Sequence, residues 1–187
     1  MTAPLHESHH TYAEYLALEA SSNVKHEFLG GQIYARAGGM PEHAALAASV
    51  IGLLFPQLRD RGCRAYDADL RIRTRSGLAT YPDVTVIYGP TERDEVDPQA
   101  VTNPALIIEV LSRSTEEYDA GDKFEHYKTL PSLRQYVLVS HRERSLEIWT
   151  LGDEWRRDVV REDQIAELAV GARLDVRELY ESAGEPR

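Results

Sequence analysis

The sequence predicts an α/β fold with a mixed β-sheet flanked by helices. Two apolar segments at residues 83–88 and 105–111 are rich in branched aliphatic residues and are bounded by turn signals, which is typical of buried strands. Helical patterns precede and follow this pair, and more strands come later. The chain has 187 residues, 42% hydrophobic and 28% charged, so we expect one globular domain over residues 1–187.

The N-terminal part is predicted to form a helix and then a hairpin. Thr11 and Glu14 have the spacing of a capping box, which favours a helix over residues 11–20. In the segment HEFLGGQIYAR, Gly30 and Gly31 supply the positive φ angles that a two-residue hairpin turn requires. A short helical and hairpin unit should therefore precede the main sheet.

The remaining elements follow from the spacing of apolar residues. A second helix is expected from residue 42 to about 61, kinked or shortened by Pro56. A third helix is expected over residues 114–130, with Ser114 as its N-cap. The acidic loop at residues 89–103 is expected on the solvated surface. Strands are predicted at 64–74, 83–88, 105–111, 135–139, 145–151 and 155–160, and a last helical turn or two in LDVRELYE.

Charge and cysteine usage exclude several classes of protein. The net charge of −10 argues against a protein that coats nucleic acid with its whole surface. Cys63 is the only cysteine, so an intrachain disulfide and a thiolate metal cluster are excluded, and we interpret it as a structural thiol. No apolar stretch reaches membrane-spanning length, and the N-terminus lacks the pattern of a secretory signal. We expect a cytoplasmic protein without a membrane partner.

Two carboxylates in the apolar strands require an explanation. Asp83 stands at the head of one strand, and Glu109 interrupts the run LIIEVL. An ionised carboxylate that is buried without a partner costs several kcal/mol, so each needs a cation, a metal or a hydrogen-bond network. If the two strands pair, alternation along them places both carboxylates on one face. Two converging carboxylates form a hard oxygen site that suits Mg²⁺ or Mn²⁺.

A candidate cation lies on the helix after the second strand. Asp119, Lys123 and Tyr127 are spaced at i, i+4 and i+8, so they share one side of that helix. A crossover helix packs back across the sheet, and Lys123 could bring its ammonium towards the carboxylates. It would neutralise part of their charge and offer a cation to a phosphate oxygen.

These motifs together resemble the Uma-two family of endonucleases in the PD-(D/E)XK nuclease superfamily. The similarity extends from about residue 11 to 151. The motifs that carry it are Pro82-Asp83, Glu109-Val110-Leu111-Ser112, Ser114-Thr115, Asp119, Lys123 and Tyr127, together with HEFLGGQIYARAGG and His43.

The resemblance implies a restriction-endonuclease-like core in which Asp83 and Glu109 hold Mg²⁺ or Mn²⁺ and hydrolyse phosphodiester bonds of nucleic acid, DNA in particular. The usual lysine of the superfamily would stand two residues after the glutamate, where this chain has Leu111. Resemblance to members with a migrated lysine moves that role to Lys123. Glu27 and His43 resemble the additional polar residues of the family and could complete the site. The apolar outer strands, together with the family resemblance, lead us to expect a homodimer.

Simpler interpretations remain open for each residue. Asp83 could cap a turn after Pro82, and Glu109 with Lys123 could be a buried structural pair. Arg71 and Arg73 share one face of a predicted strand and, with Tyr127, could contact substrate, although a solvated edge strand would look the same. A second hypothesis is therefore a catalytically silent nuclease fold that binds protein or nucleic acid. The Leu111 departure and the acidic surface favour it.

Overall fold

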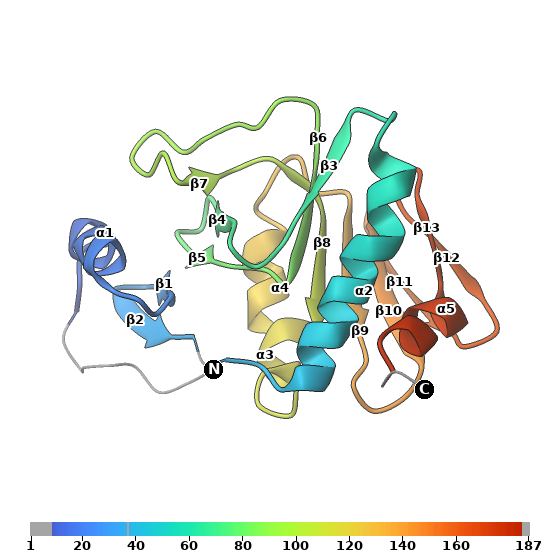
Figure 1. The fold of residues 1–187 in the computed structure, drawn as a ribbon. Helices are drawn as coiled ribbons and strands as arrows, with labels where there is room; N and C mark the ends of the chain where they lie inside the picture. The colour runs from blue at the N-terminus through green and yellow to red at the C-terminus, as the bar shows by residue number, and fades with distance from the viewer. Residues whose placement is uncertain (1–8, 37, 185–187) are drawn as a thin grey trace.

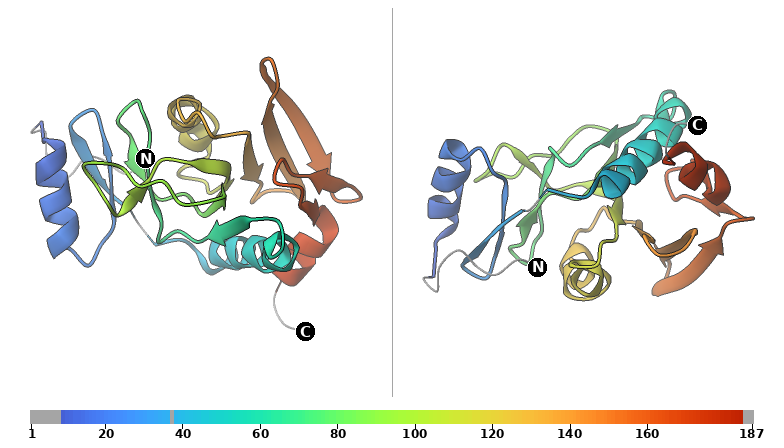
Figure 2. Two further views of the ribbon diagram at one scale, coloured as in Figure 1. Left: turned by 90° about the horizontal axis from the view of Figure 1, so that it is seen from above. Right: turned by 60° about the horizontal axis from the view of Figure 1, so that its bottom comes forward.

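The structure is a computed structural model that describes residues 9–36 and 38–184. A six-stranded mixed sheet in the order β11-β10-β9-β8-β6-β3 forms its centre (Figure 1). Views from two further directions show α2 and α5 on one side of this sheet and α3 and α4 on the other (Figure 2). The predicted fold class is confirmed. The strands of this sheet are β3 (Cys63–Tyr66), β6 (Val84–Tyr88), β8 (Pro104–Val110), β9 (Gln135–Val139), β10 (Ser145–Leu151) and β11 (Trp155–Arg161).

Strand β8 is apolar on both faces because helices cover both sides of the sheet. Leu106 and Ile108 pack in the core that α2 (Pro41–Leu58) and α5 (Val176–Ser182) cover. Ile107 lies in the second core, with side chains from α4 (Asp122–Tyr127). A strand buried on both faces reads as a continuous aliphatic run, which explains the sequence around Glu109.

A smaller unit beside the main sheet combines the N-terminal helix and hairpin with three short strands from residues 71–101 (Figure 1). Its five-stranded sheet has the order β2-β1-β5-β4-β7. The capping box of Thr11 and Glu14 is present at the start of α1, and Gly30 and Gly31 form the hairpin turn with φ angles of 55° and 82°. Both predictions are confirmed. The elements are α1 (Tyr12–Ser21), β1 (His26–Leu29), β2 (Gln32–Ala35), β4 (Arg71–Arg73), β5 (Ala79–Thr80) and β7 (Ala100–Val101).

Two predicted elements are each divided in the structure. The strand expected at 64–74 becomes β3 and β4, which belong to different sheets. The side chain of Asp67 accepts a hydrogen bond from the main chain of Asp69 (3.0 Å), a local turn that ends β3. The helix expected at 114–130 becomes α3 (Glu116–Ala120) and α4, separated by Gly121. The Tyr136 hydroxyl donates to the carbonyl of Asp119 (2.8 Å), which would otherwise accept a bond within a continuous helix.

Other differences are smaller. The second helix ends at Leu58, two residues after Pro56, so the proline lies in its last turn and the helix is shorter than expected. The loop at 89–103 is not wholly solvated, because it includes β7 and because Asp97 is buried. The strand pair β12 (Ile165–Glu167) and β13 (Arg173–Asp175) was not expected. Among the described residues, no helix combines the length and the apolarity needed to cross a membrane.

Candidate active site

Asp83 and Glu109 meet where β6 and β8 lie side by side. These strands pair antiparallel, with Val84 opposite Ile108. The main-chain N–H of Asp83 donates to Oε2 of Glu109 (3.2 Å), and the N–H of Val110 donates to Oδ2 of Asp83 (2.8 Å). Each carboxylate therefore binds the main chain beside the other. The sequence prediction that pairing brings the two together is confirmed.

Glu109 is held by two donors from α4. The Lys123 ammonium lies 2.9 Å from Oε1 of Glu109, and the Tyr127 hydroxyl donates to the same oxygen (2.7 Å). Lys123 also lies 3.1 Å from Oδ1 of Asp119 and 3.8 Å from Oε1 of Glu27. Glu109 and Lys123 are only 1% and 5% exposed, so this is an internal charge cluster.

Burial and charge act in opposite directions on the acids and bases of this cluster. Burial raises the pKa of Glu109 to about 7, although the field of Lys123 opposes the rise. Burial alone would lower the pKa of Lys123, but Glu109 and the other nearby acids raise it well above its usual value. Lys123 is therefore the permanent charge of the pair, and Glu109 is the group whose charge changes with pH.

Asp83 is held by a different set of basic side chains, which are partly exposed. Nη2 of Arg36 lies 2.7 Å from Oδ1 of Asp83, and Nε2 of His43 lies 3.1 Å from Oδ2. The Arg36 and His43 side chains are 24% and 23% exposed. Burial would raise the pKa of Asp83, but His43 and Arg36 lower it below its usual value. The hydrogen bond to Asp83 in turn raises the pKa of His43.

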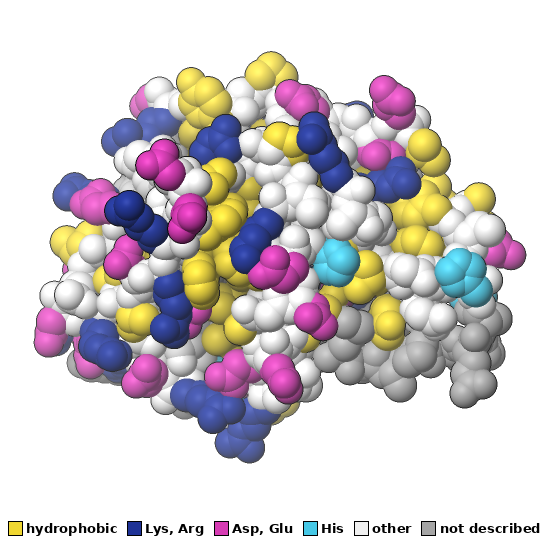
Figure 3. All heavy atoms as spheres, turned by 180° about the vertical axis from the view of Figure 1, so that it is seen from behind, with side chains coloured by type: hydrophobic (Ala, Val, Ile, Leu, Met, Phe, Trp, Pro, Cys, Tyr) yellow, Lys and Arg dark blue, Asp and Glu magenta, His cyan; other side chains and the backbone are white. Residues whose placement is uncertain are grey.

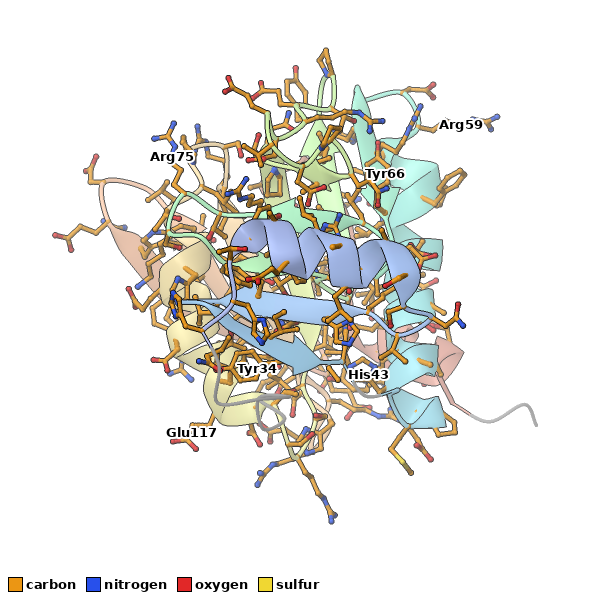
Figure 4. The ribbon with its side chains drawn as sticks, turned by 90° about the vertical axis from the view of Figure 1, so that its left-hand side faces the viewer. Tyr34, His43, Arg59, Tyr66, Arg75 and Glu117 are labelled. Carbon is orange, nitrogen blue, oxygen red and sulfur yellow. The ribbon has the colours of Figure 1, made fainter. Side chains whose placement is uncertain are left out.

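Two further elements, β1 and α2, bring the remaining predicted residues to the carboxylates. Glu27 lies on β1, where the Thr80 hydroxyl donates to its Oε1 (2.6 Å), and His43 lies in the first turn of α2. Figure 4 labels Tyr34 of the hairpin, His43 of α2 and Glu117 of α3, which lie on the side of the molecule that faces the viewer. The structure therefore places all five predicted catalytic residues in one cluster.

Arg36 is a residue of this cluster that the sequence reasoning missed. The hairpin pairs Glu27 with Tyr34, and the N–H of Arg36 donates to the carbonyl of Lys25 (2.9 Å). Side chains alternate along a strand, so Arg36 falls on the same side of the hairpin as Glu27. Extending the hairpin register by two residues would have placed it beside the predicted site.

The structure gives two of the expected substrate-contacting residues internal roles instead. Arg71 is 4% exposed; its Nη2 donates to Oδ1 of Asp97 (2.9 Å), and its Nε lies 2.7 Å from Oδ2 of the same carboxylate. Tyr127 is fully buried against Glu109. Arg73 keeps partial exposure but pairs with Asp94 (2.6 Å). Arg71 and Arg73 thus join β4 to the acidic loop at residues 89–103. Strand β4 lies in the interior of the small sheet and not at a free edge.

The oxygen atoms of Asp83 and Glu109 suit a hard divalent cation. A carboxylate has about four acceptor positions. Three donors reach Asp83, from Arg36, His43 and Val110, and three reach Glu109, from Lys123, Tyr127 and Asp83 itself. About one position remains on each carboxylate.

This number of free positions limits the kind of ion that would fit. Among the described residues, no group of three or more His, Cys, Asp or Glu is arranged to hold a metal. The donor set therefore fits an ion such as Mg²⁺ that binds one or two carboxylates and keeps waters or phosphates as its other ligands. An ion that needs a complete cage of protein ligands would not fit.

A mixed sheet between helices, with paired carboxylates on adjoining strands and a lysine that reaches them from α4, defines an α/β protein of the restriction-endonuclease-like class. Residues 12–177 match the model of the Uma2 family, described as "Putative restriction endonuclease", and the chain belongs to this family. The family to which the sequence motifs pointed is confirmed.

The chain is also similar to two Synechocystis proteins and to one solved structure. The uncharacterized protein slr1290 of Synechocystis sp. is 37% identical over 142 residues, which cover 75% of this chain and 74% of that protein. A second Synechocystis protein, sll1609, is 38% identical over 130 residues, covering 69% and 73%. The crystal structure of a "putative nuclease belonging to DUF820" from Anabaena variabilis superposes with a TM-score of 0.76 at 18% identity, covering 92% of this chain and 98% of that one. At that identity the likeness shows the fold.

Proposed function

We propose that this protein is a metal-dependent endonuclease that hydrolyses phosphodiester bonds of DNA. The observation that carries the proposal is the pairing of Asp83 with Glu109 through reciprocal main-chain hydrogen bonds, with Lys123 2.9 Å from Glu109. The family description and the description of the Anabaena neighbour both support a nuclease. Proteins with this type of fold generally use divalent metals, and the free acceptor positions suit one.

Each residue of the cluster has a distinct role in this proposal. Asp83 and Glu109 would hold Mg²⁺ or Mn²⁺, which lowers the pKa of a bound water and neutralises charge on the scissile phosphate. Lys123 opposes the effect of burial and so favours the ionised form of Glu109. His43, a cation beside Asp83 when it is protonated, would stabilise the negative charge that develops on the phosphate. Glu27, whose Oε1 lies 3.8 Å from the Lys123 ammonium, adds a negative charge that helps to keep Lys123 protonated.

The position of Lys123 supports the migrated lysine that the family resemblance implies. Leu111, which stands where the superfamily usually has lysine, is 9% exposed and belongs to the apolar core. Lys123 instead reaches the carboxylate from α4 and approaches within hydrogen-bonding distance. The same charge thus reaches Glu109 from a helix instead of from the strand.

The distribution of charge limits where DNA would bind. The face of the molecule shown in Figure 3 carries basic and acidic side chains interspersed with apolar ones. With a net charge of −10, a broad electrostatic footprint is not expected. Arg36 and, when it is protonated, His43 offer a local alternative beside Asp83, and both are partly exposed. We infer that a phosphate is bound there, and that affinity depends strongly on salt.

Calorimetric titration of Mn²⁺ and Mg²⁺ tests the proposal without a choice of substrate. We expect wild type to bind and Asp83→Asn to lose binding while it remains folded, as judged by circular dichroism. Asp163→Asn, which removes an exposed carboxylate paired with Arg177, is the matched control and should bind as wild type does. Cleavage of linear DNA, supercoiled DNA and RNA is then compared. If wild type binds no metal and cleaves none of the three, the proposal is wrong.

One observation favours the silent nuclease fold as a second candidate. Each of the two carboxylates already has three protein donors, so the cluster satisfies most of its own hydrogen-bonding capacity. A scaffold of this kind would bind protein or nucleic acid without metal. Binding of DNA by wild type that is unchanged by Mn²⁺, by a chelator and by Asp83→Asn would favour this candidate.

A further inference from the structure

Arg36 occupies the exposed side of Asp83. Its Nη2 atom contacts Oδ1 of Asp83 at 2.7 Å, and its Nη1 atom donates to the carbonyl of Tyr81. The main chain of Arg36 is fixed by the bond from its N–H to the carbonyl of Lys25. The guanidinium therefore binds two acceptors: the uncharged carbonyl of Tyr81, and the carboxylate of Asp83, which is proposed to hold the metal.

A divalent cation and the Arg36 guanidinium compete for the same oxygen. Oδ2 of Asp83 is turned to His43 and Val110, so Oδ1 carries the most accessible acceptor position. A divalent ion bound to Oδ1 would stand within a few ångströms of a guanidinium already in contact with that atom, and like charges at that distance repel strongly. The two cations are therefore expected to weaken each other's binding.

Arg36, unlike the buried Lys123, is exposed enough to contact a ligand from solvent. Lys123 is enclosed by Glu109, Asp119 and Glu27, and it is 5% exposed. The Arg36 side chain is 24% exposed, and its planar group can bind two oxygens of a phosphate at once. Of these two, Arg36 is the cation suited to contact the substrate.

We propose that Arg36 is a substrate-positioning residue that exchanges partners: it pairs with Asp83, and it moves to the substrate phosphate when a divalent ion binds that carboxylate. The bond to the carbonyl of Tyr81 would act as the pivot of this movement. The proposal rests on the proposed function, and it adds a residue and an order of events to it. The exchange couples metal binding to DNA binding, because the metal releases the cation that the phosphate requires.

Metal affinity and DNA affinity should change in opposite directions when Arg36 is replaced. Arg36→Met keeps the apolar stem and removes the charge; we expect Mn²⁺ affinity, measured by calorimetry, to rise about tenfold. We expect affinity for a short duplex DNA whose phosphorothioate linkages resist cleavage, measured with Mn²⁺ present, to fall about tenfold. Arg142→Met, which removes an exposed arginine paired with Glu116, should change neither. A purely structural role of Arg36 would lower both affinities.

The outcomes separate this proposal from the proposed function. If wild type and Arg36→Met bind Mn²⁺ equally well, or if their DNA affinities are equal, partner exchange is wrong and the metal site stands. If neither protein binds Mn²⁺, the proposed function and the exchange both fall.

A measurement on wild type covers the case in which Arg36→Met does not fold. Modification of arginines by phenylglyoxal, followed by mass spectrometry, reports how free each guanidinium is. Added Mn²⁺ should increase the rate at Arg36 several-fold and leave the exposed Arg75 unchanged. An unchanged rate at Arg36 would overturn the exchange.

Discussion

Replacing Lys123 by methionine should make the stability of the protein strongly dependent on pH. Methionine has nearly the length and volume of lysine, so the substitution removes the charge with little change in packing. It leaves Glu109 and Asp119, which lie 2.9 and 3.1 Å from the ammonium, without their cation in a buried site. Removal of one partner from a buried charge cluster costs about 3 to 5 kcal/mol.

Protonation of Glu109 can relieve most of that loss, which fixes the direction of the pH effect. Burial already raises the pKa of Glu109 from 4.5 to about 7 while Lys123 opposes the rise, and without Lys123 the pKa goes higher. The folded state then binds a proton that the unfolded state has released, so stability falls as pH rises. In the variant, stability should fall by up to about 1.4 kcal/mol for each pH unit above the unfolded pKa of Glu109, until the raised folded pKa is passed.

Urea unfolding followed by the fluorescence of Trp149 and Trp155 measures this effect. We expect the difference between Lys123→Met and wild type to be several kcal/mol at about pH 8 and clearly smaller at about pH 6. Lys128→Met is the matched control, since its exposed pair with Glu125 should contribute about 0 to 1 kcal/mol at either pH. A loss in Lys123→Met below about 1 kcal/mol, or one equal at both pH values, would show that the ammonium does not neutralise Glu109.

Three further predictions concern the same cluster and the assembly of the chain. Tyr127→Phe removes a buried donor to a charged group, and urea unfolding should show a loss of about 1.5 to 3 kcal/mol; a loss near zero would contradict the bond to Glu109. Mn²⁺ affinity in calorimetry should decrease as pH falls below about 7, because protonated Glu109 cannot bind the ion; affinity that is constant with pH would exclude Glu109 as a ligand. The homodimer expected from the sequence stays a prediction, and sedimentation that shows only monomer at micromolar concentration would refute it. The apolar character of the outer strands, on which this expectation partly rested, is not found at β11, which carries the exposed charges Arg156, Arg157 and Asp158.

The positions of the two carboxylates and the lysine could be predicted because each follows from the regular spacing of side chains along one strand or one helix. Alternation along a strand fixed which face Asp83 and Glu109 share, and the antiparallel pairing needed only a plausible loop between them. The i, i+4 spacing placed Lys123 beside Asp119. The helix is interrupted between them, at Gly121, but the Lys123 ammonium still lies 3.1 Å from Oδ1 of Asp119. Short-range geometry thus survived an error in the bounds of the helix.

The parts that could not be predicted depend on contacts between distant residues. Arg71 looked like an exposed strand arginine, and only the folded loop brings Asp97 to it and buries both. The division of the 64–74 segment between two sheets likewise depends on which partner strands are available. Arg36 is an intermediate case, because its side of the hairpin follows from the register but its contact with Asp83 does not.

The two carboxylates are buried to similar extents but are held in opposite ways. Glu109 is paired with a fully enclosed lysine, and its pKa is raised, so its charge depends on an internal partner. The partly exposed side chains of His43 and Arg36 lower the pKa of Asp83, so Asp83 stays ionised. A ligand that arrives from solvent can replace these two partners. A substrate or an ion that approaches from solvent therefore meets Asp83 first, with Arg36 and His43 as the groups it must displace or use. This asymmetry favours a site that binds its ligand through Asp83 and adjusts its charge through Glu109. In a purely structural ion pair, both sets of partners would be expected to be enclosed.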